Sequence, residues 1–232
     1  MDAVADPTAI PDARTESREA FRRATLESVS PYYVPLAHLC GPSAVGFALI
    51  TACAWLLRDV RAWQLLALPL SFVVLNRGEW HIHKYLLHRR TRFFEILYDR
   101  HTPMHHRIFI TEDMAIRSPR EFRLVLIPGF GVVLAFLSTL APAAALFVLG
   151  WRNIACLWTM TAVGYVMSYE WLHLAYHLPA TSFVGGLALV RVLRRHHAVH
   201  HHPALMQKWN FNVTIPLWDW VRGTIFRGTP PA

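Results

Sequence analysis

Histidine is the residue type through which this chain is best equipped to do chemistry. Thirteen of its fourteen histidines fall into four short clusters, within residues 81–88, 101–106, 173–177 and 196–202. Neutral imidazole is a good ligand for iron, zinc and copper, and a bound metal keeps crowded imidazoles uncharged. One mononuclear site uses roughly three or four protein ligands. The number of clustered histidines therefore fits two metals with about five ligands each.

The spacing within the clusters matches the period of a helix, on which residues three or four apart share a face. Clusters with this spacing, separated by long apolar segments, favour metal sites over a histidine-rich loop. The sets predicted to point together are His173 with His177, His101 with His105, and His197 with His200 and His201.

The first cluster does not follow this period. His83 and His88 are five residues apart, so a regular helix would turn them about 140° away from each other. They can converge if the helix widens locally into a π-type turn, a feature common at functional sites. Otherwise they bind different metals. His81 is seven residues from His88 and shares its face better, so it competes with His83 as the ligand.

Other residue types narrow the kind of metal site. The clusters contain no cysteine and few carboxylates, which argues against an iron–sulfur centre and against a carboxylate-bridged site. Glu79 lies four residues before His83 and Glu170 three before His173, so each is a candidate outer carboxylate that orients a ligand imidazole. The isolated His38 is predicted to be structural or interfacial.

Long uncharged segments must position these clusters. The chain is 54% hydrophobic and only 16% charged, against about 25% charged in soluble domains. The expected fold is all-α, with a polar N-terminal tail over residues 1–30 that includes a short helix across Ser17–Glu27, and a membrane domain over residues 31–232. Its four predicted spans cover residues 42–57, 62–76, 124–149 and 153–169. A soluble all-α protein with buried helices is the alternative.

The cations indicate an orientation. Four spans place the histidine clusters on one side, where residues 77–123 carry ten Lys or Arg and residues 178–232 carry six, against three at the opposite turns. Because cytoplasmic loops are enriched in cations, the histidine-rich side is predicted to be cytoplasmic. The net charge of +8 is thus attributed to a membrane rather than to nucleic acid. The bias of Arg over Lys favours a bacterial inner membrane.

The motifs together resemble the fatty acid hydroxylase/sterol desaturase superfamily of membrane di-iron proteins, from about Glu79 to Thr224. The first box, E-x-x-x-H-x-x-x-x-H, is matched by Glu79, His83 and His88. The second reads H-T-P-M-H-H, one residue longer than the usual H-x-x-H-H. The third is similar to G-Y-x-x-Y-D-x-x-H-x-x-x-H, and the fourth is H-x-x-H-H. The stretch from Asn210 to Trp220 resembles the family's closing segment.

This resemblance implies a four-helix membrane domain with a cytosolic helical cap that holds two iron ions, which zinc can replace in isolated protein. Three further histidines, His81, His196 and His202, would then lie around the ligands or at the substrate entrance. The ligands it implies are His83, His88, His101, His105, His106, His173, His177, His197, His200 and His201.

The chemistry implied by the resemblance is the hydroxylation of a lipid C–H bond with dioxygen. Desaturation or hydroxylation of a lipid head group is the alternative outcome. A non-catalytic metal-binding membrane protein is disfavoured, because transporters need polar residues deep within their spans. The lipid would enter from the bilayer past Trp171, Tyr176, Trp209 and Phe211, unless these aromatics form an interfacial belt.

Electrons must come from an external protein or reductase, because the sequence has no Gly-rich dinucleotide loop and no haem or iron–sulfur motif. Two basic segments could dock an acidic carrier or instead anchor the chain on anionic lipids. They contain Arg89, Arg90, Arg92, Arg194 and Arg195.

Overall fold

The computed structural model of the chain describes residues 13–231, and every regular element in that range is a helix. The all-α prediction is therefore confirmed. Two compact units are formed, Met1–Tyr33 and Val34–Ala232. In the first, α1 spans Ala13–Glu27 and contains the predicted short helix. The rest of the predicted tail, residues 1–12, lies outside the described residues.

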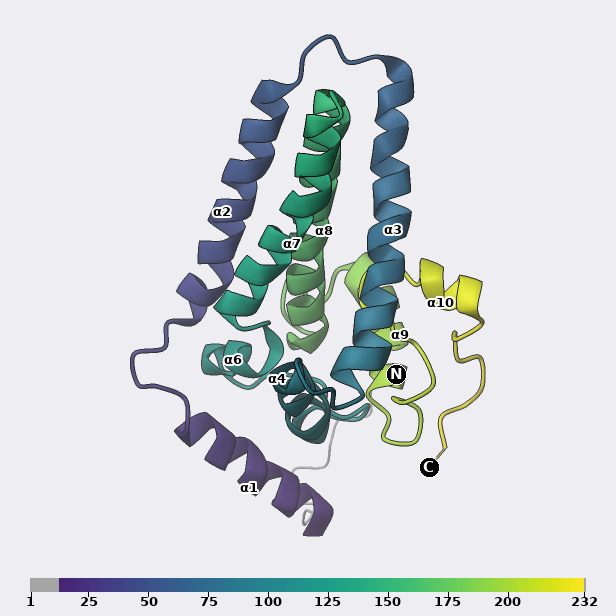
Figure 1. The fold of residues 1–232 in the computed structure, drawn as a ribbon. Helices are drawn as coiled ribbons and strands as arrows, with labels where there is room; N and C mark the ends of the chain where they lie inside the picture. The colour runs from purple at the N-terminus through teal and green to yellow at the C-terminus, as the bar shows by residue number, and fades with distance from the viewer. Residues whose placement is uncertain (1–12, 232) are drawn as a thin grey trace. The chain divides into compact units, whose positions relative to one another are not determined.

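Four long helical segments form the body of the second unit (Figure 1). They are α2 (Pro35–Leu56), η1 (Ala62–Leu66) running into α3 (Ala67–Ile82), α7 (Gly129–Val148) and α8 (Arg152–His177). α8 packs against each of the other three. The four predicted spans each overlap one of these segments. By length and composition, α2 and α7 qualify as helices able to cross a membrane.

The ends of three long helices differ from the predicted ends of the spans. The long helix expected from residue 124 begins only at Gly129, because the short helix α6 (Phe122–Val125) ends where Leu126 becomes extended, and Pro128 caps α7. Proline has no N–H to donate, so it suits the start of a helix and not its interior. In contrast, α3 and α8 continue past the predicted ends at 76 and 169. These extensions carry Glu79 and the third histidine cluster out of the apolar region.

The short elements gather at one end of the four long helices (Figure 1). They connect and follow the long helices and carry most of the histidines. Their bounds are η2 (His83–Leu87), α4 (Glu95–Arg100), η3 (His101–His105), α5 (His106–Ile108), η4 (Pro119–Glu121), α6 (Phe122–Val125), α9 (Ala188–His200) and α10 (Leu217–Arg222).

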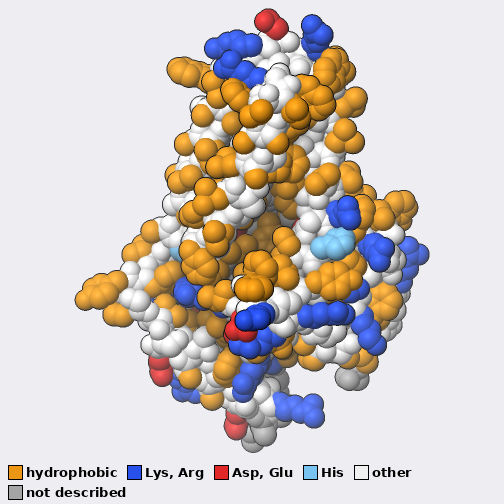
Figure 2. All heavy atoms as spheres, viewed as in Figure 1, with side chains coloured by type: hydrophobic (Ala, Val, Ile, Leu, Met, Phe, Trp, Pro, Cys, Tyr) orange, Lys and Arg blue, Asp and Glu red, His pale blue; other side chains and the backbone are white. Residues whose placement is uncertain are grey.

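The long helices pack through small and apolar contacts while leaving their outer faces apolar. Val132 and Phe136 of α7 meet Val163 and Met167 of α8 in one buried cluster. Gly46 of α2 lies so close to Met167 that a Cβ at this position would clash with its sulfur. Figure 2 shows hydrophobic side chains over the outside of these helices and charged side chains mainly at their ends. An apolar outer face of this kind is what a lipid environment requires.

Candidate metal centre

The ten histidines expected to bind metal form two groups of five, and all ten are buried. Within each group, one ring nitrogen from every member lies within 4.8 Å of all the others. The first group is His83, His88, His101, His106 and His200, and the second is His105, His173, His177, His197 and His201. The groups adjoin each other, because the His106 and His201 rings stack with centroids 4.3 Å apart.

Two π-type turns build the first group. η2 spans His83–Leu87, and the His88 amide donates to the His83 carbonyl over 3.2 Å. The wider turn brings residues five apart onto one face, so His83 and His88 converge, which is the first of the two alternatives that their spacing left open. A second π-type turn forms η3, which spans His101–His105. It pairs His101 with His106 in the first group.

Two predicted groupings are wrong. His101 and His105 do not share a site: the π turn places His105 in the second group. The expected three-ligand set on α9 is divided as well. His197 and His201 join the second group, whereas His200 projects into the first. The pairing of His173 with His177 is confirmed. The equal five-residue spacing of His83/His88 and His101/His106 was the signal in the sequence for both wide turns.

Backbone carbonyls fix the tautomers of five of these ten histidines. A carbonyl can only accept a hydrogen bond, so the Nδ1 atom facing it must carry the proton and the Nε2 lone pair points into the group. The pairs are His83 with the Phe211 carbonyl, His105 with Leu124, His177 with Met114, His200 with Trp209, and His201 with Phe109. Orientation of this kind raises the basicity of a metal-ligating imidazole.

His88 is oriented by a hydroxyl relay. The Thr102 hydroxyl donates to the Leu87 carbonyl over 2.7 Å and is 3.1 Å from His88 Nδ1. With its proton committed to the carbonyl, the hydroxyl oxygen accepts from Nδ1–H. Nε2 of His88 therefore faces His200 Nε2 at 3.0 Å with its lone pair available.

Burial keeps these imidazoles neutral. Burial lowers the pKa of His83 and of His105 to about 3, and neighbouring histidines add to the effect. Burial also lowers the pKa of His200 and His201 well below the usual range. Neutral rings with converging lone pairs fit a metal ion. The absence of thiolates and carboxylates from either group fits iron, zinc or copper rather than calcium or magnesium.

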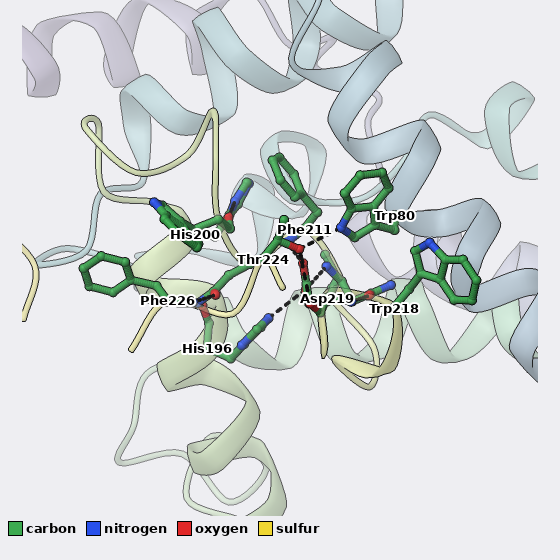
Figure 3. A network of polar contacts seen from close by, with 12 residues as sticks. Trp80, His196, His200, Phe211, Trp218, Asp219, Thr224 and Phe226 are labelled. Carbon is green, nitrogen blue, oxygen red and sulfur yellow. Dashed lines mark hydrogen bonds and ion pairs between the residues drawn. The ribbon is translucent and has the colours of Figure 1, made fainter. Parts of the chain in front are cut away.

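Residues 209–214 form a loop that serves the first group, and Asp219 holds it. The Asp219 carboxylate accepts the amide protons of Phe211 and Asn212, over 3.0 and 2.7 Å, and contacts His196 (Figure 3). Burial alone would raise the pKa of Asp219, but bonds from His196, Thr224 and the Asn212 amide lower it. The charged carboxylate thus presents the carbonyls of this loop to two ligands.

The two glutamates singled out in the sequence hold backbone segments. Glu79 accepts bonds from the amides of Val213 and Thr214 and from the Thr214 and Tyr165 hydroxyls. Glu170 accepts the Ile127 amide proton at both oxygens, over 3.2 Å. Among the described residues neither carboxylate bonds a ligand imidazole. Glu79 instead orients His83 indirectly, because the loop that it holds through Val213 and Thr214 includes the Phe211 carbonyl that faces His83.

The remaining histidines lie outside both groups. His81 Nδ1 faces the Arg77 carbonyl at 2.8 Å, so His83 and not His81 enters the site. His196 contacts Asp219, and His202 contacts the Pro231 carbonyl. His38 Nε2 lies 2.9 Å from the Ile127 carbonyl, consistent with its predicted structural role.

A cavity of about 470 Å³ reaches both groups of histidines. It touches His83 and His101 of the first group and His105 and His173 of the second. Apolar side chains from three long helices form much of the wall. The lining includes Val74, Leu75 and Ile82 of α3, Phe130 and Ala135 of α7, and Val166 and Tyr169 of α8.

The aromatics suggested for the substrate path are not among the residues that line this cavity. Trp171 is 42% exposed and bonds Ser43, while the buried Tyr176 donates to the Val213 carbonyl. Trp209 packs on Phe226, and Phe211 lies against the first group of histidines. The apolar lining comes instead mainly from aliphatic residues, with Phe130, Tyr165 and Tyr169, and such residues do not stand out within a uniformly apolar segment.

Replacing Asp219 with Asn is expected to weaken metal binding at the first group about 10- to 100-fold, as loss of an outer-shell partner does elsewhere. The amide removes the charge and one acceptor, so the loop carrying the Phe211 carbonyl loosens. Metal titration of the purified variant would measure this. The control is Asp99→Asn, because Asp99 is an exposed carboxylate paired with Arg90. Equal affinity in both variants would contradict the role given to Asp219.

Comparison with known proteins identifies one family. The family model described as fatty acid hydroxylase matches residues 68–224, a range that contains all ten histidines of the two groups. No curated protein and no solved structure matches the chain significantly.

Proposed function

The chain belongs to the fatty acid hydroxylase family, and from this we propose that it is an integral membrane di-iron oxygenase that hydroxylates a lipid C–H bond. The proposed substrate is fatty acyl or sterol-like. The observation that carries the proposal is the apolar cavity that touches two buried groups of five histidines. A lipid chain in this cavity would lie against both proposed metals.

We infer four membrane spans from α2, the η1–α3 segment, α7 and the first part of α8. The apolar outer faces of the long helices support this arrangement, as does the lack of Lys and Arg in α2, in α7 and in residues 62–76 and 153–169. The short helices with the histidines would then form a cap on the cytoplasmic side, where most Lys and Arg lie. A bacterial inner membrane is the proposed location.

The proposed reaction converts RH, O₂, two electrons and two protons into ROH and H₂O. Iron held by the two groups would supply the activation of dioxygen, and zinc would replace it in isolated protein without supporting turnover. The chain itself would bind and orient the substrate and exclude water through the apolar wall of the cavity. The two electrons would come from an external carrier or reductase.

The proposal is tested by expressing the chain with a reductase system in a bacterial host and comparing host lipids by mass spectrometry. A gain of one oxygen atom in a lipid chain, absent from a His177→Ala/His200→Ala control, is the expected result. A loss of two hydrogens would identify a desaturase, and an added oxygen on the head group a different site of attack. Unchanged lipids from iron-loaded protein would overturn the proposal.

Gly78 gives a prediction about the width of the cavity. A Cβ at this position would meet nothing within 4 Å, and Gly78 lies on the cavity wall. Gly78→Leu is therefore expected to fill the cavity without a clash and to lower kcat/KM for the wild-type substrate at least about tenfold. Shorter or thinner chains should be less affected. Product yields across a series of lipid chain lengths would measure this.

The matched control is Gly41→Leu. Gly41 is also a helical glycine with open space around its Cβ position, but it is exposed and away from the cavity. Gly78→Leu should favour the helix by about 1 kcal/mol, and Gly41→Leu by less, because Gly41 precedes Pro42. A loss of activity confined to Gly78→Leu would therefore report the cavity. Equal activity of Gly78→Leu and wild type on every chain length would refute this role of the cavity.

A further inference from the structure

A basic surface lies around the C-terminal end of α3. It consists of Arg77, Lys84, Arg89 and Arg222, which come from α3, η2, the segment after η2, and α10. Figure 2 shows Lys and Arg side chains gathered in this region. We call these four residues the basic face. Within residues 13–231, none of the four has an ion pair with a carboxylate, so their charges are available to a partner.

The basic face covers a group of aromatic rings. Lys84 Nζ lies 4.7 Å from the centroid of Trp80, and the Arg222 guanidinium carbon lies 5.4 Å from it. Arg89 lies 5.1 Å from the ring of Tyr85, which is 6.0 Å from Trp80. The indole of Trp80 is only 1% exposed. These cations therefore form the outer layer over a buried tryptophan.

The same aromatic group reaches the first group of histidines. Trp80 and Phe211 have centroids 5.6 Å apart. Phe211 lies 5.9 Å from His83 and 5.7 Å from His200, and Lys84 Nζ lies 5.2 Å from its ring. Closely spaced π systems thus connect the basic face to two ligands.

We propose that the basic face docks an acidic one-electron carrier protein, and that electrons reach the first group of histidines past Trp80 and Phe211. This inference depends on the proposed function, which requires two electrons per product. Each encounter oxidises one reduced carrier by one electron, and two encounters supply one turnover. Opposite charge on the carrier would speed its approach and set its orientation. Anionic lipid head groups would be attracted by the same charges, but the connection from this face to the ligands favours the carrier.

A plant-type ferredoxin, which is small and acidic, serves as the probe. Its dissociation constant is measured against metal-free protein in neutral phosphatidylcholine nanodiscs, and its oxidation rate against the iron-loaded protein. Lys84→Glu/Arg222→Glu is expected to weaken binding and slow electron transfer at least about tenfold at low salt, with the difference shrinking as salt rises. Arg191→Glu/Arg227→Glu, an equal charge change at two exposed positions elsewhere, is the control and should match wild type.

Chemical reduction with dithionite distinguishes a failure of the docking proposal from a failure of the proposed function. Dithionite reduces iron without docking, so the Lys84→Glu/Arg222→Glu protein should yield as much product as wild type in a single turnover. If dithionite-reduced wild type holding two irons forms no product, the proposed function fails. If wild type binds the ferredoxin no better than Lys84→Glu/Arg222→Glu does, or if Arg92→Glu/Arg195→Glu causes the loss instead, the proposed docking face is overturned. A defect confined to anionic nanodiscs would identify a lipid anchor and also overturn it.

Discussion

Replacing His200 with Ala is expected to abolish product formation and to lower bound iron from about two ions per chain to about one or fewer. His200 is fully buried in the first group, and its Nδ1 is already committed to the Trp209 carbonyl. Alanine removes a ligand and leaves a carbonyl without its donor. His177→Ala should have the same effect through the second group. Iron analysis of purified protein, together with product yield, measures both consequences.

His81→Ala is the control for both ligand variants. His81 belongs to the same cluster of the sequence as His83, but its ring contacts only a carbonyl of its own helix and aromatic neighbours. This variant should retain both irons and full activity. Two irons and wild-type activity in His200→Ala would refute the assignment of the first group, and the same result in His177→Ala would refute the second.

Lowering the pH from about 7.5 to about 5 is expected to destabilise the metal-free protein sharply. In the folded chain the pKa values of His83 and His105 lie at about 3, whereas in the unfolded chain they lie near ~6.5. Between these values only the unfolded chain takes up protons. The free energy of unfolding therefore falls as pH drops below about 6.5, by up to about 1.4 kcal/mol per pH unit for each such imidazole.

Thermal unfolding in detergent, followed from about pH 8 to about pH 4, checks that stability falls as the pH is lowered. Stability should be nearly flat above about pH 7 and fall steeply below about pH 6.5, where protons also compete with metal for the ligands. Because ten buried imidazoles contribute, the total loss of unfolding free energy should exceed the loss caused by protonating any single carboxylate. Constant stability from pH 7 to pH 4 would contradict neutral, buried rings.

The sequence predicted which histidines gather better than it predicted their arrangement. Histidine clusters and uncharged segments are local patterns, so thirteen clustered histidines and four long segments were identifiable, and the resemblance to the family narrowed the histidines to ten. The division into two groups depends on helix geometry: a regular period pairs His101 with His105, and only the π turn pairs it with His106. A one-residue change in turn width is enough to exchange ligands between sites.

What surrounds the ligands could not be predicted, because it depends on contacts between distant segments. The Phe211 carbonyl that orients His83 is 128 residues away from it, and any residue type can offer a carbonyl. Asp219 lies in a stretch that resembled the family, yet its bonds to two amides follow from the turn before α10. The cavity wall is drawn from apolar segments in which lining and lipid-facing residues look alike.

The two wide turns also determine which mutations the chain can accumulate. Residues 84–87 and 102–105 occupy π turns whose length, more than their side chains, sets the direction of the histidines on either side. Substitutions at exposed positions of these turns should be common among descendants of this gene. A single-codon insertion would place the flanking histidines six residues apart and turn one of each pair out of its group, whereas a single-codon deletion would place them four apart, a spacing at which an ordinary helix still keeps them on one face. Natural variants of these turns are therefore expected to tolerate the loss of one residue but not the gain of one.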